Sequence, residues 1–437
     1  MSRKINSVAV LGGGTMGAGI AGLCAERDCK VLLLDVSLEV AEQALERIVG
    51  GRPPALDTPE KAGNITLGTL EDDLEKIADY DWICEAVIED LATKQALFAR
   101  IEKVRKVGSV VSSNTSGIPL RDIIEGLPDT LAADIAITHF FNPVKVMRLM
   151  ELVPSDKTTP DVMEAFSDFC GGTLGKGVVY AKDTVNFIGN RIGCFWMLMG
   201  LHRANVALNQ GVDMETIDAL MSTPVGLPPT GLYGLVDLIG LDVMDFVGKN
   251  LALNLPKFDL GEGFTDFPAS VQALFDRGQL GRKTGGGFYR VQKLDDGSKK
   301  KETFDLKSGD WRPTKSITLK KEHRDLTVLL ADDPLGWLAW DLMGETLLYA
   351  AGLLPQIADD IGNIDRAMRW GFAWTNGPFQ MLDALGPLKV IEKLEAMEGE
   401  LPKMLKVLQD SGETHFYRNE GAEYLGLDGA YHPVPGE

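Results

Sequence analysis

The chain has few cysteines, and none of them forms a short-spaced pair. Its 437 residues include five cysteines, and no two are arranged as Cys-x-x-Cys. That absence argues against the usual spacing of a zinc site and against a redox dithiol. We therefore expect no metal site, and scattered unpaired thiols favour a reducing compartment such as the cytoplasm.

Positive charge is also in short supply. The chain has 44 Lys and Arg residues against 63 Asp and Glu residues, which gives a formal net charge of −19. An acidic surface argues against nucleic acid and against an anionic membrane as partners, because both are negatively charged. A ligand that carries phosphate would therefore have to meet local basic groups.

Long uncharged apolar runs are missing as well. The longest apolar stretches are too short to span a membrane or carry charge, so no membrane insertion is expected. The N-terminus shows no signal-peptide pattern. The chain is long and rich in apolar residues. Its 437 residues, of which 45% are hydrophobic, are enough for two or three domains with a sizeable core.

The clearest motif follows the first apolar run. Residues 8–11 predict a buried parallel strand, after which the sequence reads Gly-x-Gly-x-x-Gly and continues as a helical pattern. Glycines at this spacing permit a tight turn, a close approach of the backbone to a pyrophosphate, and close packing of the helix on the strand. The helix N-terminus offers N–H groups to phosphates. The loop residues expected to contact a dinucleotide are Gly12, Gly14, Thr15, Met16 and Gly17.

A carboxylate follows the second predicted strand. Residues 31–34 are apolar and lead to Asp35, at roughly the distance downstream at which an acid binds the ribose diol. An acid at this position favours NAD, because it repels the 2′-phosphate of NADP. The alternative is a glycine-rich turn in an ordinary α/β domain with Asp35 as a helix cap. The ordered succession of strand, glycines, helix, strand and acid favours the dinucleotide site.

Strands that alternate with helices over the first part of the chain predict a mostly parallel sheet. Beyond residue 184 the helical period dominates, beginning with one long helix over 187–210. The predicted fold class is therefore α/β followed by all-α. Further strands of the sheet are expected at 81–87, 109–113, 133–138, 149–153 and 177–181.

The helical part contains an internal repeat. Ile217-Asp218 and Asp237 have counterparts in Ile364-Asp365 and Asp383, with glycines at similar spacings around them. Two such units packed face to face would bury one another's apolar helices. Alternating aromatic and charged residues between them predict an exposed hairpin. The predicted domains are 1–184 for dinucleotide binding, 185–290 for the first helical repeat, 291–333 for a charged hairpin and linker, and 334–437 for the second repeat and tail.

Polar side chains follow several of the predicted strands, at the sheet edge where ligands bind. His139 is one of only five histidines, and Glu151 lies on the next strand, where it could reach the imidazole. A carboxylate on one ring nitrogen fixes the tautomer and makes the other nitrogen more basic. Such a pair could take a proton from an alcohol while a hydride leaves the same carbon. The alternative is a strand-end histidine with a satisfied hydrogen bond, which the nearby dinucleotide motif makes less favoured.

Other polar residues have both a functional and a structural interpretation. Ser116 could orient a substrate hydroxyl, or could be a turn residue or N-cap before the helix that begins near Pro119. Asn190 lies in the first turns of the long helix, where asparagine is unfavourable unless it makes a polar contact. Lys283 could bind a phosphate or a carboxylate, or could be a solvated loop lysine. Glu89 and Lys94 lie on the loop and helix that follow the strand at 81–87.

Together these motifs resemble the L-3-hydroxyacyl-CoA dehydrogenases of fatty-acid β-oxidation, over nearly the whole chain. The resemblance implies a Rossmann-type N-terminal domain with NAD as cofactor. It also implies that His139 and Glu151 form a catalytic dyad, and that Ser116 and Asn190 orient the substrate. The matching segments are 12–17, 85–90 with Lys94, 113–116, 139–143 with Glu151, 182–191 and 281–289. The implied NAD contacts are Gly12, Gly14, Thr15, Met16, Gly17, Asp35, Glu89, Lys94, Ser116, Asn142 and Lys283.

The reaction implied by the resemblance is oxidation of (S)-3-hydroxyacyl-CoA to 3-oxoacyl-CoA, so an acyl-CoA is the expected substrate. The chain departs from the family at Val185-Asn186, where Pro-Gly is usual, and at Gly117, where a small polar residue is common. The doubled helical unit is similar to that of the long, multifunctional members, which favours a fused or partner enoyl-CoA hydratase. A tandem repeat could also replace the dimer interface of short members, so a monomer is expected, with a homodimer as the alternative.

Two other functions stay open on the sequence alone. One is an NAD-dependent dehydrogenase of a free β-hydroxyacid, which would be expected to use a catalytic lysine in place of the pair His139–Glu151. The other is a non-catalytic NAD-binding protein that keeps the fold, which would be expected to have lost that pair. Both members of the pair are present in this chain.

Overall fold

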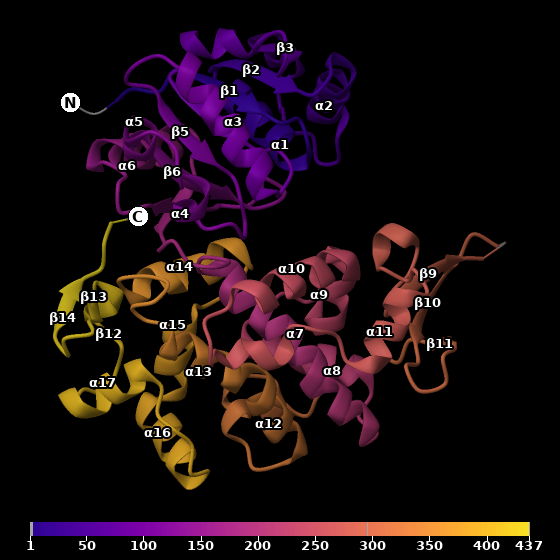
Figure 1. Ribbon diagram of the computed structural model, residues 1–437. Helices are drawn as coiled ribbons and strands as arrows, with labels where there is room; N and C mark the ends of the chain where they lie inside the picture. The colour runs from indigo at the N-terminus through magenta and orange to yellow at the C-terminus, as the bar shows by residue number, and fades with distance from the viewer. Residues whose placement is uncertain (1–2, 295, 437) are drawn as a thin grey trace. The chain divides into compact units, whose positions relative to one another are not determined.

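The computed structural model describes residues 3–294 and 296–436 (Figure 1). The chain forms two compact units. The first contains the residues up to Ile188 together with the short segment Gln356–Asp359, and the second contains most of the rest. The first unit is α/β and the second is mainly helical.

An eight-stranded sheet organises the α/β unit. The strand order is β3-β2-β1-β4-β5-β6-β7-β8, and each neighbouring pair is parallel except β6 with β7. The predicted mostly parallel sheet is therefore confirmed. The strands are β1 Ser7–Leu11, β2 Lys30–Asp35, β3 Ile65–Thr69, β4 Trp82–Glu85, β5 Val110–Ser113, β6 Ile135–Phe140, β7 Leu149–Pro154 and β8 Gly177–Tyr180.

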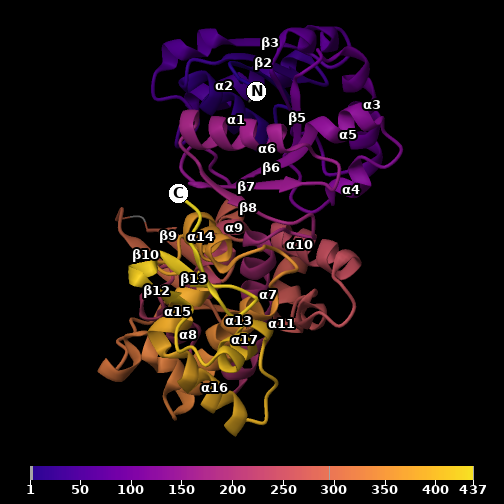
Figure 2. The ribbon, with the colours of Figure 1, turned by 90° about the vertical axis from the view of Figure 1, so that its left-hand side faces the viewer.

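Helices connect these strands and pack along the sheet (Figures 1 and 2). The helix after β1 contacts both β1 and β2, which is the close helix-on-strand packing that the glycine motif predicts. The α-helices are α1 Thr15–Glu26, α2 Leu38–Gly50, α3 Leu91–Val104, α4 Leu120–Ile123, α5 Asp129–Asp134 and α6 Pro160–Ser167, with 3-10 turns at Pro59–Asn64 and Leu74–Asp79 and a π turn at Asp168–Thr173.

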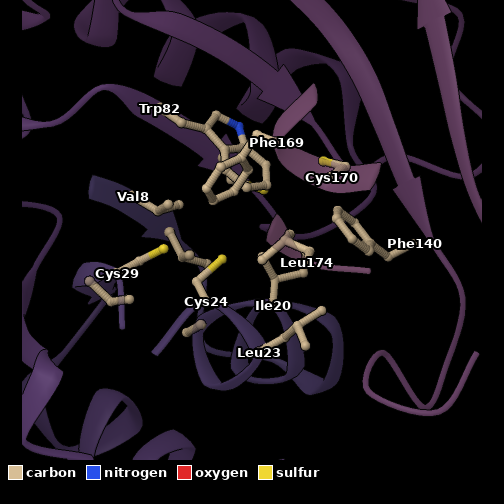
Figure 3. Packing of buried hydrophobic residues seen from close by; sticks show 14 of the residues in the cluster. Val8, Ile20, Leu23, Cys24, Cys29, Trp82, Phe140, Phe169, Cys170 and Leu174 are labelled. Carbon is tan, nitrogen blue, oxygen red and sulfur yellow. The ribbon is translucent and has the colours of Figure 1, made fainter. Parts of the chain in front are cut away.

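The core of this unit is an apolar cluster between sheet and helices (Figure 3). It brings together Val8 of β1, Cys24 of α1, Trp82 of β4, Phe140 of β6 and Cys170 of the π turn. These residues are distant in sequence, so the cluster joins β1 and the helix after the glycine loop to the strand that carries His139. Burying such large side chains contributes on the order of 1.5–3 kcal/mol each.

All five cysteines are buried and unpaired. Burial raises the pKa of Cys29 to about 11 and the pKa values of Cys84 and Cys194 to about 12. A thiol with so high a pKa stays protonated near neutral pH and is a poor nucleophile. These cysteines therefore act as small apolar side chains of the core.

A segment from late in the chain completes the α/β unit. The backbone N–H of Lys182 donates to the carbonyl oxygen of Ile357 at 2.9 Å. The ammonium of Lys182 also lies 2.6 Å from Asp359. The segment Gln356–Asp359 thus belongs by its contacts to the first unit, although it interrupts the sequence of the second.

The helical unit is built around its longest helix, α7 Gly189–Asn209, which falls within the predicted range 187–210. This helix packs against α9 and α10 from the first half of the unit and against α13 and α14 from the second half. In the described parts of the chain, no helix combines the length and apolar character that a membrane span needs. The other helices are α8 Met214–Leu220, α9 Gly231–Ile239, α10 Leu241–Asn254, α11 Ala269–Asp276, α12 Pro334–Ala339, α13 Glu345–Gly352, α14 Ile361–Gly371, α15 Pro378–Leu385, α16 Pro387–Ala396 and α17 Lys403–Ser411.

Two small antiparallel sheets accompany these helices. The predicted hairpin is present as β9 with β10, and β11 adds a third strand. The second small sheet, β12-β13-β14, was not predicted, because strands of two or three residues carry no readable alternation. The strands are β9 Tyr289–Lys293, β10 Lys299–Phe304, β11 Trp311–Pro313, β12 Tyr417–Arg418, β13 Glu423–Leu425 and β14 Tyr431–Pro433.

The same hydrogen-bond arrangement occurs in both halves of the helical unit. In each half one aspartate, the partly buried Asp218 or the buried Asp365, accepts bonds from two backbone N–H groups in the first turn of the next helix. The same carboxylate accepts a bond from one tyrosine hydroxyl, that of Tyr289 or Tyr417. Both aspartates lie at the equivalent positions of the sequence repeat.

A second aspartate in each half, Asp237 or Asp383, holds the tyrosine's own backbone. It accepts the N–H of that tyrosine and of the preceding phenylalanine. Glycine is needed beside the first aspartate in both halves, since a Cβ at Gly231 or Gly377 would overlap the aspartate side chain. The two halves therefore make matching contacts with matching residues.

Candidate active site

The glycine loop joins β1 to α1. Gly12 has a φ of 107°, which favours glycine, and a Cβ there would lie 2.5 Å from the carbonyl oxygen of Ala86. A Cβ at Gly17 would overlap the carbonyl of Gly12. Gly14 differs, because it is exposed and a Cβ would meet nothing within 4 Å. The first and third glycines thus serve packing, and the second leaves open space for a ligand.

The first turn of α1 fits a phosphate group. Its N-cap residue is Gly14, and no side chain caps the helix. The N–H groups of this turn therefore have no side-chain acceptor at the cap, which suits an anion. Thr15 is exposed at the start of the helix, whereas Met16 is half-buried and packs against the core.

Asp35 is the last residue of β2 and lies beside the glycine loop. Its carboxylate accepts the N–H of Gly13 at 2.5 Å and the N–H of Val36 at 2.6 Å. These bonds fix the acid at the tip of the strand, where a ribose diol binds in this type of fold. Arg47 of α2, which the sequence did not single out, donates to the carbonyl oxygen of Gly13 at 2.5 Å.

His139 and Glu151 lie directly opposite each other on β6 and β7. The two strands are antiparallel, and their register pairs the two residues. Opposite residues of an antiparallel pair point to the same face, so the side chains meet. Nδ1 of His139 is 2.6 Å from Oε2 of Glu151, and the exposed fractions are 3% for the histidine and 0% for the glutamate. The N–H of Ile188 donates to the other oxygen of Glu151 at 3.0 Å.

Ser116 meets the second ring nitrogen of the histidine. Its Oγ lies 2.9 Å from Nε2 of His139, and Ser116 is the exposed residue of a mostly buried loop after β5. Because a carboxylate faces Nδ1, the proton of a neutral imidazole belongs on Nδ1, and Nε2 is left as an acceptor. The rings of Phe141 and Phe187 pack on the imidazole at centroid distances of 4.6 and 5.5 Å. The basic nitrogen therefore faces the loop side of the site.

A carboxylate holds the loop that carries Ser116. Glu89 accepts bonds from the hydroxyl of Thr115 and from the N–H groups of Ser116 at 3.0 Å and Gly117 at 3.1 Å. Burial would raise the pKa of Glu89, but the charge of Lys94 and these hydrogen bonds outweigh it and hold the pKa below its ordinary value. Glu89 is therefore a carboxylate at neutral pH, and it fixes the serine.

Lys94 lies beneath this loop between two carboxylates. Its side chain is 1% exposed, and Nζ is 2.8 Å from Glu85 and 3.3 Å from Glu89. Glu85 ends β4, is fully buried and also accepts the hydroxyl of Ser113 at 2.6 Å. The resemblance implies that Lys94 and Glu89 contact the cofactor; in the structure both bind residues of the protein, and their contacts to NAD stay predictions. The sequence assigned Glu85 no role, although a glutamate at the end of an apolar strand was a visible signal.

Asn142 is exposed on the turn after β6. It lines a cavity of about 140 Å³ together with Thr15 and Gly19 of α1 and with Val144. The turn after the histidine strand and the first turns of the helix after the glycine loop thus share one cavity.

The remaining two predicted site residues belong to the helical unit. Asn190 is the second residue of α7 and is partly exposed. Lys283 lies in a 3-10 turn, and its Nζ is 2.5 Å from Oδ1 of Asp242. Arg191, next to Asn190, is fully buried and binds Asp259 at 2.5 Å, so it stabilises the helical unit. The roles of Asn190 and Lys283 toward a ligand stay predictions.

At residues 185–186, where the sequence departs from the family pattern, the backbone enters the left-handed region. Asn186 has a φ of 60° and Phe187 a φ of 49°. The family's usual glycine takes this conformation without strain, and asparagine is among the residues that tolerate it best. Asn186 is 4% exposed, and among the described residues its Nδ2 has no hydrogen-bond partner.

Known proteins match the chain along most of its length. A family model described as "3-hydroxyacyl-CoA dehydrogenase, NAD binding domain" matches residues 7–184, and one described as "3-hydroxyacyl-CoA dehydrogenase, C-terminal domain" matches residues 187–291. A relative from Bacillus subtilis, named "Probable 3-hydroxyacyl-CoA dehydrogenase", is 35% identical over an alignment of 472 residues. The alignment covers 99% of this chain and 58% of the relative.

A second relative and a solved structure agree with this family. A Rickettsia felis protein, whose name describes a trifunctional enzyme of a fatty acid oxidation complex, is 35% identical over 93% of this chain and 57% of its own length. The chain thus spans less than three fifths of these two relatives. The crystal structure of 3-hydroxybutyryl-CoA dehydrogenase from Escherichia coli K12 matches with a TM-score of 0.72 and 25% identity, over 94% of this chain and 99% of that chain. The α/β unit is an NAD-binding domain, and the chain belongs to the 3-hydroxyacyl-CoA dehydrogenase family.

Proposed function

We propose that this protein oxidises (S)-3-hydroxyacyl-CoA to 3-oxoacyl-CoA with NAD, in fatty-acid β-oxidation. The observation that carries the proposal is the buried pair of His139 and Glu151, whose free ring nitrogen faces Ser116 within an NAD-binding domain. The names of the Bacillus subtilis and Rickettsia felis relatives support the substrate class and the pathway.

His139 is the general base of the proposed reaction. Its Nδ1–H donates to Glu151, so Nε2 is free to take the proton of the substrate's 3-hydroxyl. Glu151 then stabilises the imidazolium that forms. Ser116 lies within hydrogen-bond distance of the same nitrogen and orients the hydroxyl. When bound, NAD supplies the acceptor for the hydride from C3 of the substrate.

The α/β unit's own residues fit NAD. The open space at Gly14, the uncapped first turn of α1 and the acid Asp35 at the tip of β2 suit a pyrophosphate and a ribose diol. In the proposed site, Glu89 and Lys94 hold the loop of Ser116, and all three residues are also proposed to contact NAD. The other proposed contacts are Gly12, Thr15, Met16, Gly17, Asn142 and Lys283 to NAD, and Asn190 to the substrate.

The two relatives are longer than this chain, so a further activity is proposed in addition to the dehydrogenase. Because the Rickettsia felis relative is named as a trifunctional enzyme, we propose an enoyl-CoA hydratase as a fused or partner activity. The matching aspartate and tyrosine contacts support the proposal that residues 185–290 and 334–437 are two copies of one helical unit.

The test is NADH oxidation with acetoacetyl-CoA by the wild type, His139→Ala and His415→Ala. Loss of the base should lower kcat by on the order of 10²–10⁴. His415 is exposed and serves as the matched control, so its variant should retain wild-type turnover. Far-UV circular dichroism of each variant checks the fold.

Other results would contradict the proposal in distinct ways. Free acetoacetate that is turned over in place of the thioester would indicate a β-hydroxyacid dehydrogenase. If the wild type bound NADH but turned over neither compound, the protein would be a non-catalytic NAD-binding protein. Equal activity of the His139→Ala variant and the wild type would exclude this histidine as the base.

A further inference from the structure

Lys176 is a buried lysine of the α/β unit, directly before β8. It is 7% exposed. Its Nζ donates to the carbonyl oxygen of Val144 and, at 2.7 Å, to that of Met147. The ammonium also lies 6.0 Å from the ring centroid of Phe140. In residues 3–294 and 296–436, no carboxylate forms an ion pair with Lys176.

A buried ammonium without a carboxylate costs stability. Burial lowers the pKa of Lys176 to about 8, against the opposing influence of Cys170. Its surroundings belong to the apolar cluster of Figure 3, which includes Phe140, Cys24 and Cys170. An unbranched apolar side chain such as methionine would fill this space without the cost of desolvating a charge. The charged side chain of Lys176 is therefore explained by the two backbone carbonyl groups to which it donates hydrogen bonds.

Those carbonyls belong to the turn between β6 and β7. The turn starts two residues after His139 and includes Asn142, and the side chain of Val144 rests on α1, since a Cβ at Gly19 would come within 2.7 Å of it. Asn142 and Val144 also line the cavity that Thr15 shares. The turn thus lies between the strand of the proposed base and the helix of the glycine loop.

The beginning of this segment has separate anchors. His139 is held by Glu151, and the N–H of Phe140 donates to Oδ1 of Asn114 at 2.9 Å. Lys176 holds the far end, at residues 144 and 147. Asn142 lies between the two anchored parts, and its place depends on both.

We propose that Lys176 is a positioning residue, which binds the carbonyls of Val144 and Met147 and so places the turn of Asn142 against bound NAD. This inference rests on the proposed dehydrogenase function. Lys176 touches neither cofactor nor substrate in this role. Its removal should weaken NADH binding because the turn would lose two charge-assisted hydrogen bonds and shift.

The titration of Lys176 gives a second signature. The charged and titratable groups that act on it are Cys170, Arg27 and Cys24. Burial raises the pKa values of both thiols far above neutrality, and an arginine stays charged, so the lysine is the group of this cluster that titrates near pH 8. NADH affinity of the wild type should therefore fall as the pH rises through about 8.

The experiment is a fluorescence titration with NADH, from neutral pH to well above pH 8, on four proteins. In Lys176→Met, Kd at neutral pH should rise by about tenfold, and its pH dependence should be flat. Lys176→Arg keeps a charged donor that does not titrate, so it should bind near wild-type affinity without the alkaline loss. Lys157→Met, at an exposed lysine paired with exposed Asp129, is the matched control and should behave as the wild type.

The outcomes separate this inference from the proposed function. Wild-type affinity in a folded Lys176→Met protein would overturn the positioning role, as would a wild-type Kd that stays constant through pH 8. The criterion based on the wild-type Kd holds even if the Lys176→Met variant does not fold. A wild type that binds NADH with the expected pH dependence but fails to reduce acetoacetyl-CoA would instead overturn the proposed function and leave Lys176 a positioning residue for NADH.

Discussion

Buried charges hold single residues of the proposed site in place. Lys94 forms ion pairs with the fully buried Glu85 and with Glu89. The substitution Lys94→Met therefore leaves the carboxylate of Glu85 buried without its ion-pair partner. We expect the free energy of unfolding to fall by about 3–5 kcal/mol in urea denaturation. Lys103→Met, at an exposed position of the same helix, should change it by less than about 0.5 kcal/mol. Equal stability of the two variants would contradict the ion-pair argument.

Glu151 should matter for turnover more than for binding. Glu151→Gln keeps the size of the side chain but removes the charge that, in the proposed reaction, stabilises the imidazolium of His139. We expect kcat to fall on the order of 10²–10⁴ with little change in KM for acetoacetyl-CoA. Steady-state kinetics beside Glu164→Gln, an exposed glutamate of α6, checks this. A higher KM at unchanged kcat would assign Glu151 to substrate binding instead.

The sequence allowed the pairing of His139 with Glu151 to be predicted, because both lie on neighbouring strands and a carboxylate suits an imidazole. It also allowed the glycines and Asp35 to be placed at one sheet edge. It did not indicate the partners of Lys176 or Arg47, since both bind backbone carbonyls. Every residue has a carbonyl, so side-chain types and spacing cannot indicate which one a lysine or arginine will meet.

At the scale of elements, the hydrogen bond of Tyr289 to Asp218 can be compared directly with that of Tyr417 to Asp365. Tyr289→Phe removes one hydroxyl donor from the partly buried carboxylate of Asp218, and Tyr417→Phe removes one from the buried carboxylate of Asp365. Each should lower the free energy of unfolding by about 0.5–1.5 kcal/mol. If the halves are copies, the two losses should agree within about 0.5 kcal/mol. Urea denaturation measures them, with Tyr180→Phe as the control, because this more exposed tyrosine donates to the hydroxyl of Ser167 at 2.8 Å and not to a carboxylate.

The same carboxylates predict how stability depends on pH. Burial raises the pKa values of Asp218 and Asp365 to about 7, whereas an unfolded aspartate titrates near about 3.9. Between these values the folded state binds more protons, so this contribution to stability is complete below the unfolded pKa and is lost as the pH rises through 7. The urea midpoint should fall across that range, and replacing both residues by asparagine should flatten the dependence. An unchanged slope in the double variant would contradict the assignment.

Elements differed in how readable they were from sequence. Long strands such as β2 and β6 and the long helix α7 were predicted because their apolar patterns are continuous. Strand β3 was missed, since only Ile65 and Gly68 of its residues are buried and its pattern is short. Its place in the sheet comes from pairing with β2, a contact that local sequence does not encode.

For the whole molecule, the packing of the helical unit argues for a monomer. Helix α7 of its first half is covered by the second half, where Phe195 stacks on Tyr349 at 3.9 Å and Arg203 binds Glu345 at 2.8 Å. A face already covered within one chain has no need of a second copy. We expect light scattering to give the mass of one chain, 47.5 kDa, whereas twice that mass would favour the homodimer.

The segment Gln356–Asp359 has a consequence for how the molecule is made. It supplies the carbonyl and the carboxylate that bind Lys182 of the α/β unit. During synthesis on the ribosome, the residues up to Ile188 emerge first but lack these contacts until residue 359 has also emerged. Folding of the α/β unit therefore begins first but is completed late, after most of the helical unit has been translated.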